Sequence, residues 1–219
     1  STFLPSFSAS ADAGVSTEAL AQLRNQVHEV ILSNGMRVIM YRRGIAPVFS
    51  GVVGVRVGGT DEQPGKTGIS HMFEHMAFKG TARRTAQNIA EEMDNVGGQL
   101  NAYTSRDHTA YYAKVLAGDL PLAIDIIADI LQHSTYDKAE LERERGVILQ
   151  EIGQALDTPD DLVFDQFQVT AFPGQPLGRP VLGTAATVEA IGRESRLLPM
   201  EMGAACRVPA LKIRGWNFQ

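Results

Sequence analysis

Hydrophobic and polar residues follow two different periods along the chain, and each period predicts one kind of element. Short runs of β-branched and aromatic residues bounded by glycine, serine or asparagine are typical of β-strands. The strands expected on this basis are residues 27–32, 37–41, 48–57, 100–105 and 109–115. Short polar turns separate the first pair, at 33–35, and the last pair, at 106–108, so each pair predicts a hairpin.

Longer segments with an apolar residue every three or four positions predict helices. The helices expected are residues 68–78, 85–96, 119–131, 137–156 and 159–171. Thr67 is a candidate N-cap of the first of these helices, and Gly80 lies just past its end.

The order of these elements predicts the fold class. Strands gather early in the chain and helices late, which favours an α+β fold in which helices pack on a mainly antiparallel sheet. A length of 219 residues allows one large domain or two small ones. We expect one folded domain at 27–194, an N-terminal arm at 1–26, and a tail at 195–219 that shows neither period.

Composition and charge exclude several classes of partner. With 44% hydrophobic and 21% charged residues, the chain has the composition of an ordinary soluble globular protein. The net charge of −5, without a long run of either sign, gives no reason to expect a nucleic-acid partner. No apolar stretch approaches the roughly 20 residues that cross a bilayer, so no membrane span is expected.

The first fifteen residues bear on the compartment. They contain no basic residue, unlike an intact signal sequence or an arginine-rich transit peptide. We expect a soluble protein of the bacterial cytoplasm or periplasm rather than of the mitochondrial matrix, and the compartment itself stays open.

A histidine pair in the first expected helix carries the candidate chemistry. His71 and His75 are four positions apart and share one face of the helix, with Glu74 beside them. Imidazole is a good zinc ligand, and a catalytic zinc needs three protein ligands and one open position. Since Cys206 is the single cysteine, a further ligand must be His, Asp or Glu.

The helix at 137–156 offers candidates for the third ligand. Glu144 and Glu151 are seven residues apart and lie nearly on one line, with Glu140 close to it, whereas Glu142 points the other way. Periodicity favours Glu151 over Glu144 only modestly. The alternative is that both belong to a solvated, charged face.

Three segments together resemble the pitrilysin and insulinase family of zinc peptidases, and within it the processing peptidases and their bacterial relatives. They are HMFEHMAFKGT at 71–81, GGQLNAYTSRDHTAYYAKV at 97–115 and ERGVILQEI at 144–152. The resemblance implies that His71, His75 and Glu151 bind Zn²⁺. It also implies that Glu74 is the general base and that Glu144 supports the site as a second carboxylate.

The same resemblance implies how substrate and partner bind. The strand at 100–104 would pair with an extended peptide backbone, which makes Asn101, Ala102 and Tyr103 substrate contacts; the alternative is an ordinary hairpin face. Family members close a chamber with a second, similarly folded domain or a partner subunit. This chain is too short to contain that second half, and an apolar face left exposed would favour self-association.

The sequence therefore predicts a zinc endopeptidase acting on extended or unfolded peptides, weakly active on its own. The alternatives are a non-catalytic peptide-binding or assembly subunit and a stand-alone metal-binding module. The loop at 59–67 is glycine-rich, but its glycine spacing and Pro64 do not fit a phosphate-binding loop. We expect His28, His108 and His133 to be structural or surface residues.

Overall fold

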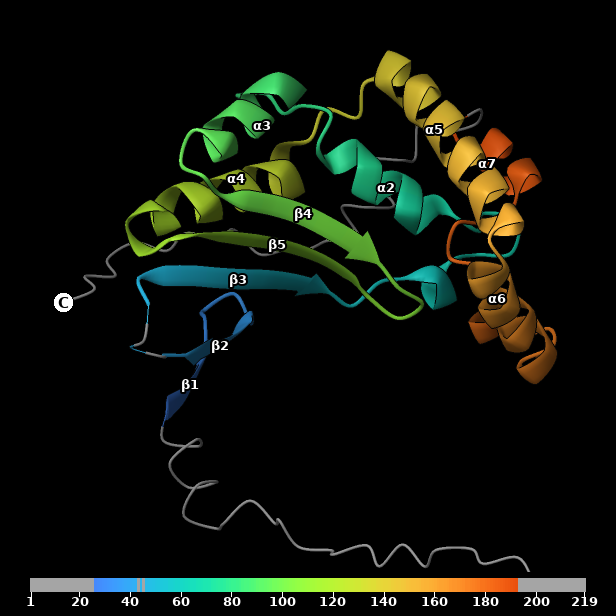
Figure 1. Cartoon of the computed structure of the whole chain (residues 1–219), viewed down its shortest axis with the longest axis horizontal. Coiled ribbons are helices and arrows are strands. Elements are labelled where there is room, and N and C mark those ends of the chain that lie inside the picture. The colour runs from blue at the N-terminus through green and yellow to red at the C-terminus, as the bar shows by residue number, and fades with distance from the viewer. Residues whose placement is uncertain (1–25, 43, 45, 193–219) are drawn as a thin grey trace, which may run out of the picture. The chain divides into compact units, whose positions relative to one another are not determined.

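The computed structural model describes residues 26–42, 44 and 46–192 (Figure 1). The expected arm at 1–26, apart from Gln26, and the expected tail at 195–219 lie outside the described residues. The chain divides into two compact units, Ser1–Ala46 and Pro47–Gln219. Within the described residues, no helix is long and apolar enough to cross a membrane.

The first unit contains the expected hairpin. Strands β1 (Val27–Ile31) and β2 (Arg37–Tyr41) pair antiparallel. Arg37 donates two hydrogen bonds to the carboxylate of Glu29 on the opposite strand, at 2.6 and 3.0 Å. The first strand ends at Ile31 rather than at 32, because the next residue already forms the turn with Gly35, whose φ is 84°.

The second unit is built on a three-stranded sheet. Its strands are β3 (Val48–Val55), β4 (Gln99–Thr104) and β5 (Thr109–Leu116), all antiparallel in the order β3-β5-β4. β3 ends at Val55 rather than at 57, because the chain then leaves the sheet and bonds to the β4–β5 turn. Among the described strands β4 pairs only with β5, so it forms an edge of this sheet.

Six α-helices are described, and they confirm the expected α+β class. They are α2 (Ile69–Ala77), α3 (Ala86–Asp94), α4 (Leu120–His133), α5 (Lys138–Asp157), α6 (Pro159–Ala171) and α7 (Ala185–Ala190). The sequence pattern did not predict the six-residue α7. Short 3-10 turns η1 (Gly59–Asp61), η2 (Ala117–Asp119) and η3 (Pro176–Gly178) complete the unit.

One core lies between the sheet and the helices α3 and α4, which cover one of its faces (Figure 1). β5 contributes buried Ala113 and Val115, and α4 contributes Ile126 and Ile130. These apolar side chains pack α4 directly onto the sheet.

A second core joins α2 to α5 and α7. Met72 and Met76 of α2 pack with Ile148 of α5 and Val188 of α7, and all four are at most 1% exposed. Full burial of such a side chain contributes roughly 1.5–3 kcal/mol. This packing fixes α2 and α5, which carry the expected metal ligands, against one another.

A buried ionic cluster holds the segment after α2 to α4. The side chain of Asp129 is fully buried and accepts hydrogen bonds from Thr81 (2.8 Å), Arg84 (2.9 Å) and Arg83 (3.0 Å). His133 lies 3.2 Å from the same carboxylate. A buried charge with this many partners is satisfied, and Asp129 thereby links the segment that follows α2 to helix α4.

Replacing Asp129 by Asn should lower the free energy of unfolding at pH 7 by about 3 kcal/mol, because two arginines lose their buried anion. Burial by itself raises the pKa of Asp129, but the bonds from Thr81, Arg84 and Arg83 outweigh it and hold the pKa below its ordinary value of 3.8. Such a group contributes stability that is present above about pH 4 and is lost as the pH falls through the folded-state value.

The difference between the wild-type chain and Asp129→Asn should therefore be large at pH 7 and shrink below about pH 4. Urea unfolding followed between pH 7 and pH 3 measures it. A difference that stayed constant over this range would show that the charge of Asp129 does not stabilise the fold.

Candidate metal and catalytic site

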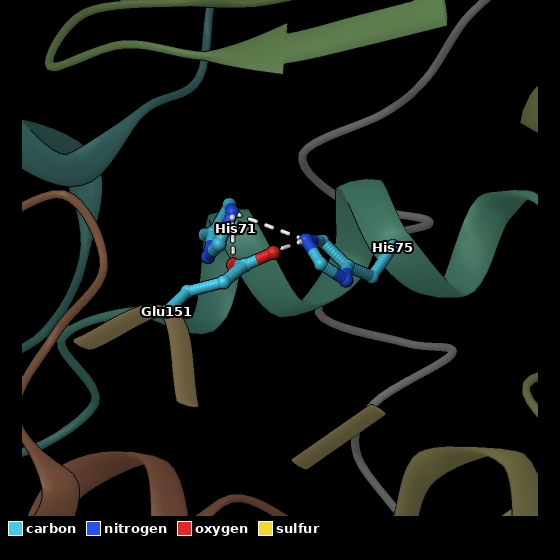
Figure 2. Close-up of side chains that lie close together, drawn as sticks. All are labelled: His71, His75 and Glu151. Carbon is cyan, nitrogen blue, oxygen red and sulfur yellow. Dashed lines mark hydrogen bonds and ion pairs between the residues drawn. The ribbon is translucent and has the colours of Figure 1, made fainter. Parts of the chain in front are cut away.

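Helix α2 places two imidazoles side by side. His71 and His75 lie one turn apart, and their Nε2 atoms are 3.2 Å from each other (Figure 2). The helix does not begin as predicted. Its N-cap is Gly68, with a φ of 94°, and not Thr67; a Cβ at Gly68 would also lie 2.6 Å from the carbonyl oxygen of Leu182.

Helix α5 brings a carboxylate to the same point. Oε2 of Glu151 lies 3.6 Å from Nε2 of His71 and 3.6 Å from Nε2 of His75. Within the described residues these three form the group of His, Cys, Asp or Glu side chains that could hold a metal ion. Periodicity left Glu144 and Glu151 open as third ligand, and the structure brings Glu151 to the histidine pair.

The spacing of the three atoms tests whether a zinc ion fits. Zinc–nitrogen and zinc–oxygen bonds of about 2.0–2.1 Å in tetrahedral geometry place neighbouring ligand atoms about 3.3 Å apart. The observed 3.2, 3.6 and 3.6 Å lie close to that value. The side chain of Glu151 is 36% exposed, against 11% for His71 and 16% for His75, so the site opens to solvent on the glutamate side.

Glu144 bonds the ring nitrogen of His75 that does not approach Glu151. Its Oε2 accepts a hydrogen bond from Nδ1 of His75 at 2.9 Å, and its Oε1 pairs with Nζ of Lys79 at 2.7 Å. With the proton on Nδ1, the lone pair of Nε2 faces Glu151, as a metal ligand requires. Burial by itself raises the pKa of Glu144, but Lys79 and His75 outweigh it and hold the pKa below its usual range.

His71 has no comparable support. Its Nδ1 atom is buried and has no hydrogen-bond partner among the described residues. Burial, helped by the neighbouring His75, lowers the pKa of His71 to about 4. His71 is therefore neutral near pH 7, which is the form that binds metal.

Glu74 lies on the same helix as the two histidines, and its carboxylate is bonded by the edge strand. Oγ1 of Thr104 donates a hydrogen bond to Oε2 of Glu74 at 2.6 Å. Burial raises the pKa of Glu74, and the bond from Thr104 acts against this shift. Because Thr104 is the last residue of β4, the edge strand touches the side chain expected to act as general base.

The expected substrate strand lies at this edge of the sheet. Asn101 and Tyr103 are exposed on β4, whereas the side chain of Ala102 points into the core. Oδ1 of Asn101 accepts a hydrogen bond from the amide of Ala102 at 2.8 Å. The ring of Tyr103 packs edge-on against His108, and its hydroxyl lies 3.3 Å from Nε2 of that histidine.

Three residues near the site were not predicted from the sequence. Lys79 lies one turn beyond His75, so extending the helical period by one residue would have found it. The contact of Thr104 with Glu74 depends on how the sheet packs on α2, which no local pattern records. Glu62 accepts hydrogen bonds from the start of α2, across a loop that has no regular period.

Known proteins resemble this chain in sequence. Residues 38–185 match the family model described as insulinase, peptidase family M16. The chain is 46% identical over 163 residues to an uncharacterized zinc protease of Rickettsia bellii, covering 74% of this chain and 40% of the relative. It is 42% identical over 182 residues to the mitochondrial-processing peptidase subunit beta of Bos taurus, covering 82% of this chain and 37% of the relative.

Two solved structures resemble the fold. A protease from Helicobacter pylori superposes with a TM-score of 0.76 at 25% identity, covering 82% of this chain and 43% of the other. A peptidase M16 inactive domain from Pseudomonas fluorescens superposes with a TM-score of 0.73 at 16% identity, covering 80% and 42%. The chain thus spans about two-fifths of the length of these relatives. The family model covers more than half of the chain, and the chain belongs to the insulinase family of peptidases, M16.

Proposed function

We propose that this chain is the zinc-binding, catalytic half of an endopeptidase that cleaves extended or unfolded peptides. One observation carries the proposal: Nε2 of His71, Nε2 of His75 and Oε2 of Glu151 converge from two packed helices at the spacing of zinc ligands. The zinc-protease names of the relatives agree with this choice of metal.

The residues divide the work of peptide hydrolysis among them. His71, His75 and Glu151 would hold the ion, and Glu144 would keep His75 in the binding tautomer. A bound zinc supplies Lewis-acid activation of water and of the scissile carbonyl. Glu74 accepts the proton of the attacking water and passes it to the leaving amine. Its raised pKa brings the carboxyl closer to the working pH, which favours both transfers.

The edge strand β4 would hold the substrate. An extended peptide can add to an open edge through backbone hydrogen bonds, and this reads backbone rather than sequence. Asn101, Ala102 and Tyr103 are the contacts that we assign to it. Since Thr104 of the same strand bonds Glu74, a peptide on this edge would lie next to the general base.

Full activity would need a second half. Each backbone hydrogen bond contributes only about 0.5–1.5 kcal/mol net, and one strand edge is too little to hold a peptide in reactive geometry. This chain covers only 40% of one relative and 37% of another, and the second of these is named as a subunit. We propose that a second, similarly folded domain or partner subunit closes the site.

The alternative is a non-catalytic subunit that binds peptides or supports assembly. It has support in the fold itself, because a domain named inactive shares this fold. The fold alone therefore does not imply catalysis, and the ligand set with Glu74 favours the peptidase. Peptide cleavage that depends on Glu74 would distinguish a peptidase from a non-catalytic subunit.

The purified chain should bind one zinc per molecule, because all three donor side chains lie on it. His71→Ala and Glu151→Ala should each abolish stoichiometric binding. Metal analysis after zinc loading and dialysis measures this, with Glu189→Gln on the exposed face of α7 as a control that binds like wild type. Less than half an equivalent in a folded wild-type chain would contradict the site.

Replacing Glu74 by Gln should lower the rate of peptide cleavage by roughly 10²–10⁴-fold and leave the zinc content unchanged, because the amide cannot take up the proton. The new side chain still offers an oxygen to Thr104, so local packing is kept. A quenched fluorescent peptide, assayed with the second half present, measures the rate. Cleavage at the wild-type rate would remove Glu74 from the mechanism.

Supplying the second half should raise kcat/KM by orders of magnitude and leave zinc affinity nearly unchanged. The part of a full-length relative that this chain does not cover, added as a separate chain, provides that half. Peptide cleavage with and without it, at equal zinc content, gives the comparison. Full activity in a strictly monomeric preparation of the 219 residues would contradict the need for a partner.

A further inference from the structure

The glycine-rich loop at 59–67 has a role that differs from phosphate binding. It consists of η1 and the segment that enters α2, and its Glu62 is only 8% exposed. Burial raises the pKa of Glu62, so keeping this carboxylate out of water costs stability unless hydrogen-bond donors contact it. The donors that contact it belong to the first turn of the helix that carries the proposed metal ligands.

Glu62 caps α2 from outside the helix. Its Oε2 accepts a hydrogen bond from the amide of Gly68 at 2.9 Å, and its Oε1 accepts one from the amide of Ser70 at 2.8 Å. The first amides of a helix have no partner within it, and a negative charge there is favourable. α2 has no capping side chain of its own, because its N-cap is a glycine.

Glu62 is itself held in place from outside the loop. Nη1 of Arg179 donates to its backbone carbonyl at 2.6 Å. Upstream, the amide of Thr60 donates to the carbonyl of Arg106 in the β4–β5 turn at 2.7 Å. Downstream, Gly183 and Gly68 pack so closely that a Cβ on either would clash with the other segment's backbone. The carboxylate is therefore part of a rigid frame.

The two metal-binding histidines differ in how they are supported. His75 is held through its own ring by Glu144, whereas Nδ1 of His71 has no partner among the described residues. The position of the His71 ring thus depends on packing and on the backbone of the first helical turn. Ser70, whose amide Glu62 binds, is the residue immediately before His71.

We propose that Glu62 is a positioning residue for the metal site. It fixes the first turn of α2 and thereby keeps His71 in position, as Glu144 does for His75. This inference rests on the proposed zinc site. It gives each imidazole one supporting carboxylate, which acts through the ring for His75 and through the backbone for His71.

Glu62→Gln tests the proposal in the full 219-residue chain. The amide keeps the shape of the side chain but accepts only one of the two bonds and turns an NH₂ group toward a backbone N–H. Loss of a supporting partner weakens metal binding by roughly 10–100-fold, and zinc affinity should fall by at least about tenfold. Competition with a chromophoric chelator, using zinc alone as the probe, measures this affinity.

Thr85→Ala is the matched control. Thr85 caps α3, which carries no metal ligand, by accepting a bond from the amide of Asn88 at 3.1 Å. Its loss should lower the Tm of the metal-free chain but leave zinc affinity within about twofold of wild type. Zinc affinity that fell equally in both variants, in step with Tm, would reduce Glu62 to a purely structural role and overturn the proposal.

Arg179→Ala covers the case in which Glu62→Gln does not fold. It keeps the carboxylate but frees the loop that carries it, so zinc binding should weaken several-fold. Unchanged zinc affinity in every variant that folds would overturn the positioning role and leave the zinc site intact. Absence of zinc binding in the wild-type chain would instead overturn the proposed function, and the positioning role with it.

Discussion

The packing of α2 on α5 is the contact on which the candidate site depends. Met72 and Met76 bury themselves against Ile148 and the neighbouring α7. The histidine pair and Glu151 project from these same two helices, so a small shift between them would change both 3.6 Å separations at once. A close-packed core does not deform continuously, so it keeps the two helices in one relative position. Apolar packing thereby sets the distances between the polar groups of the site.

Around that core, polar and charged side chains are linked in a short chain of hydrogen bonds and ion pairs. Lys79 holds Glu144, Glu144 holds His75, and Glu151 meets both histidines from the solvent side. Among the described residues, the buried polar side-chain atoms have hydrogen-bond partners, and Nδ1 of the neutral His71 is the exception. The sheet joins this arrangement through Thr104, whose hydroxyl ties the end of the edge strand β4 to the carboxylate of Glu74.

The sequence predicted the elements and the histidine pair well because those features are local. Strand alternation, helical periodicity and the spacing of His71 and His75 each depend on neighbours a few residues away. Periodicity alone left the choice between Glu151 and Glu144 open, because both lie on one helical line and only the packing of α5 against α2 separates them. Glu62 was missed for a related reason, because its partners lie across a loop. The N-cap expected from the sequence was Thr67. The N-cap is instead Gly68, which is left-handed and lies so close to the backbone of residues 182–183 that a side chain would not fit there.

The hydrogen bond from the amide of Ala102 to the side chain of Asn101 affects which strands can pair with the edge strand β4. An edge strand with free amides is a template for pairing with any other strand, including one from a second copy of the chain. On β4 the side chain of Asn101 covers the amide of its own neighbour. Because this short side chain can rotate away, the cover is reversible. A strand that approaches β4 therefore meets an amide that already has an acceptor, and has to displace the side chain before it can pair there.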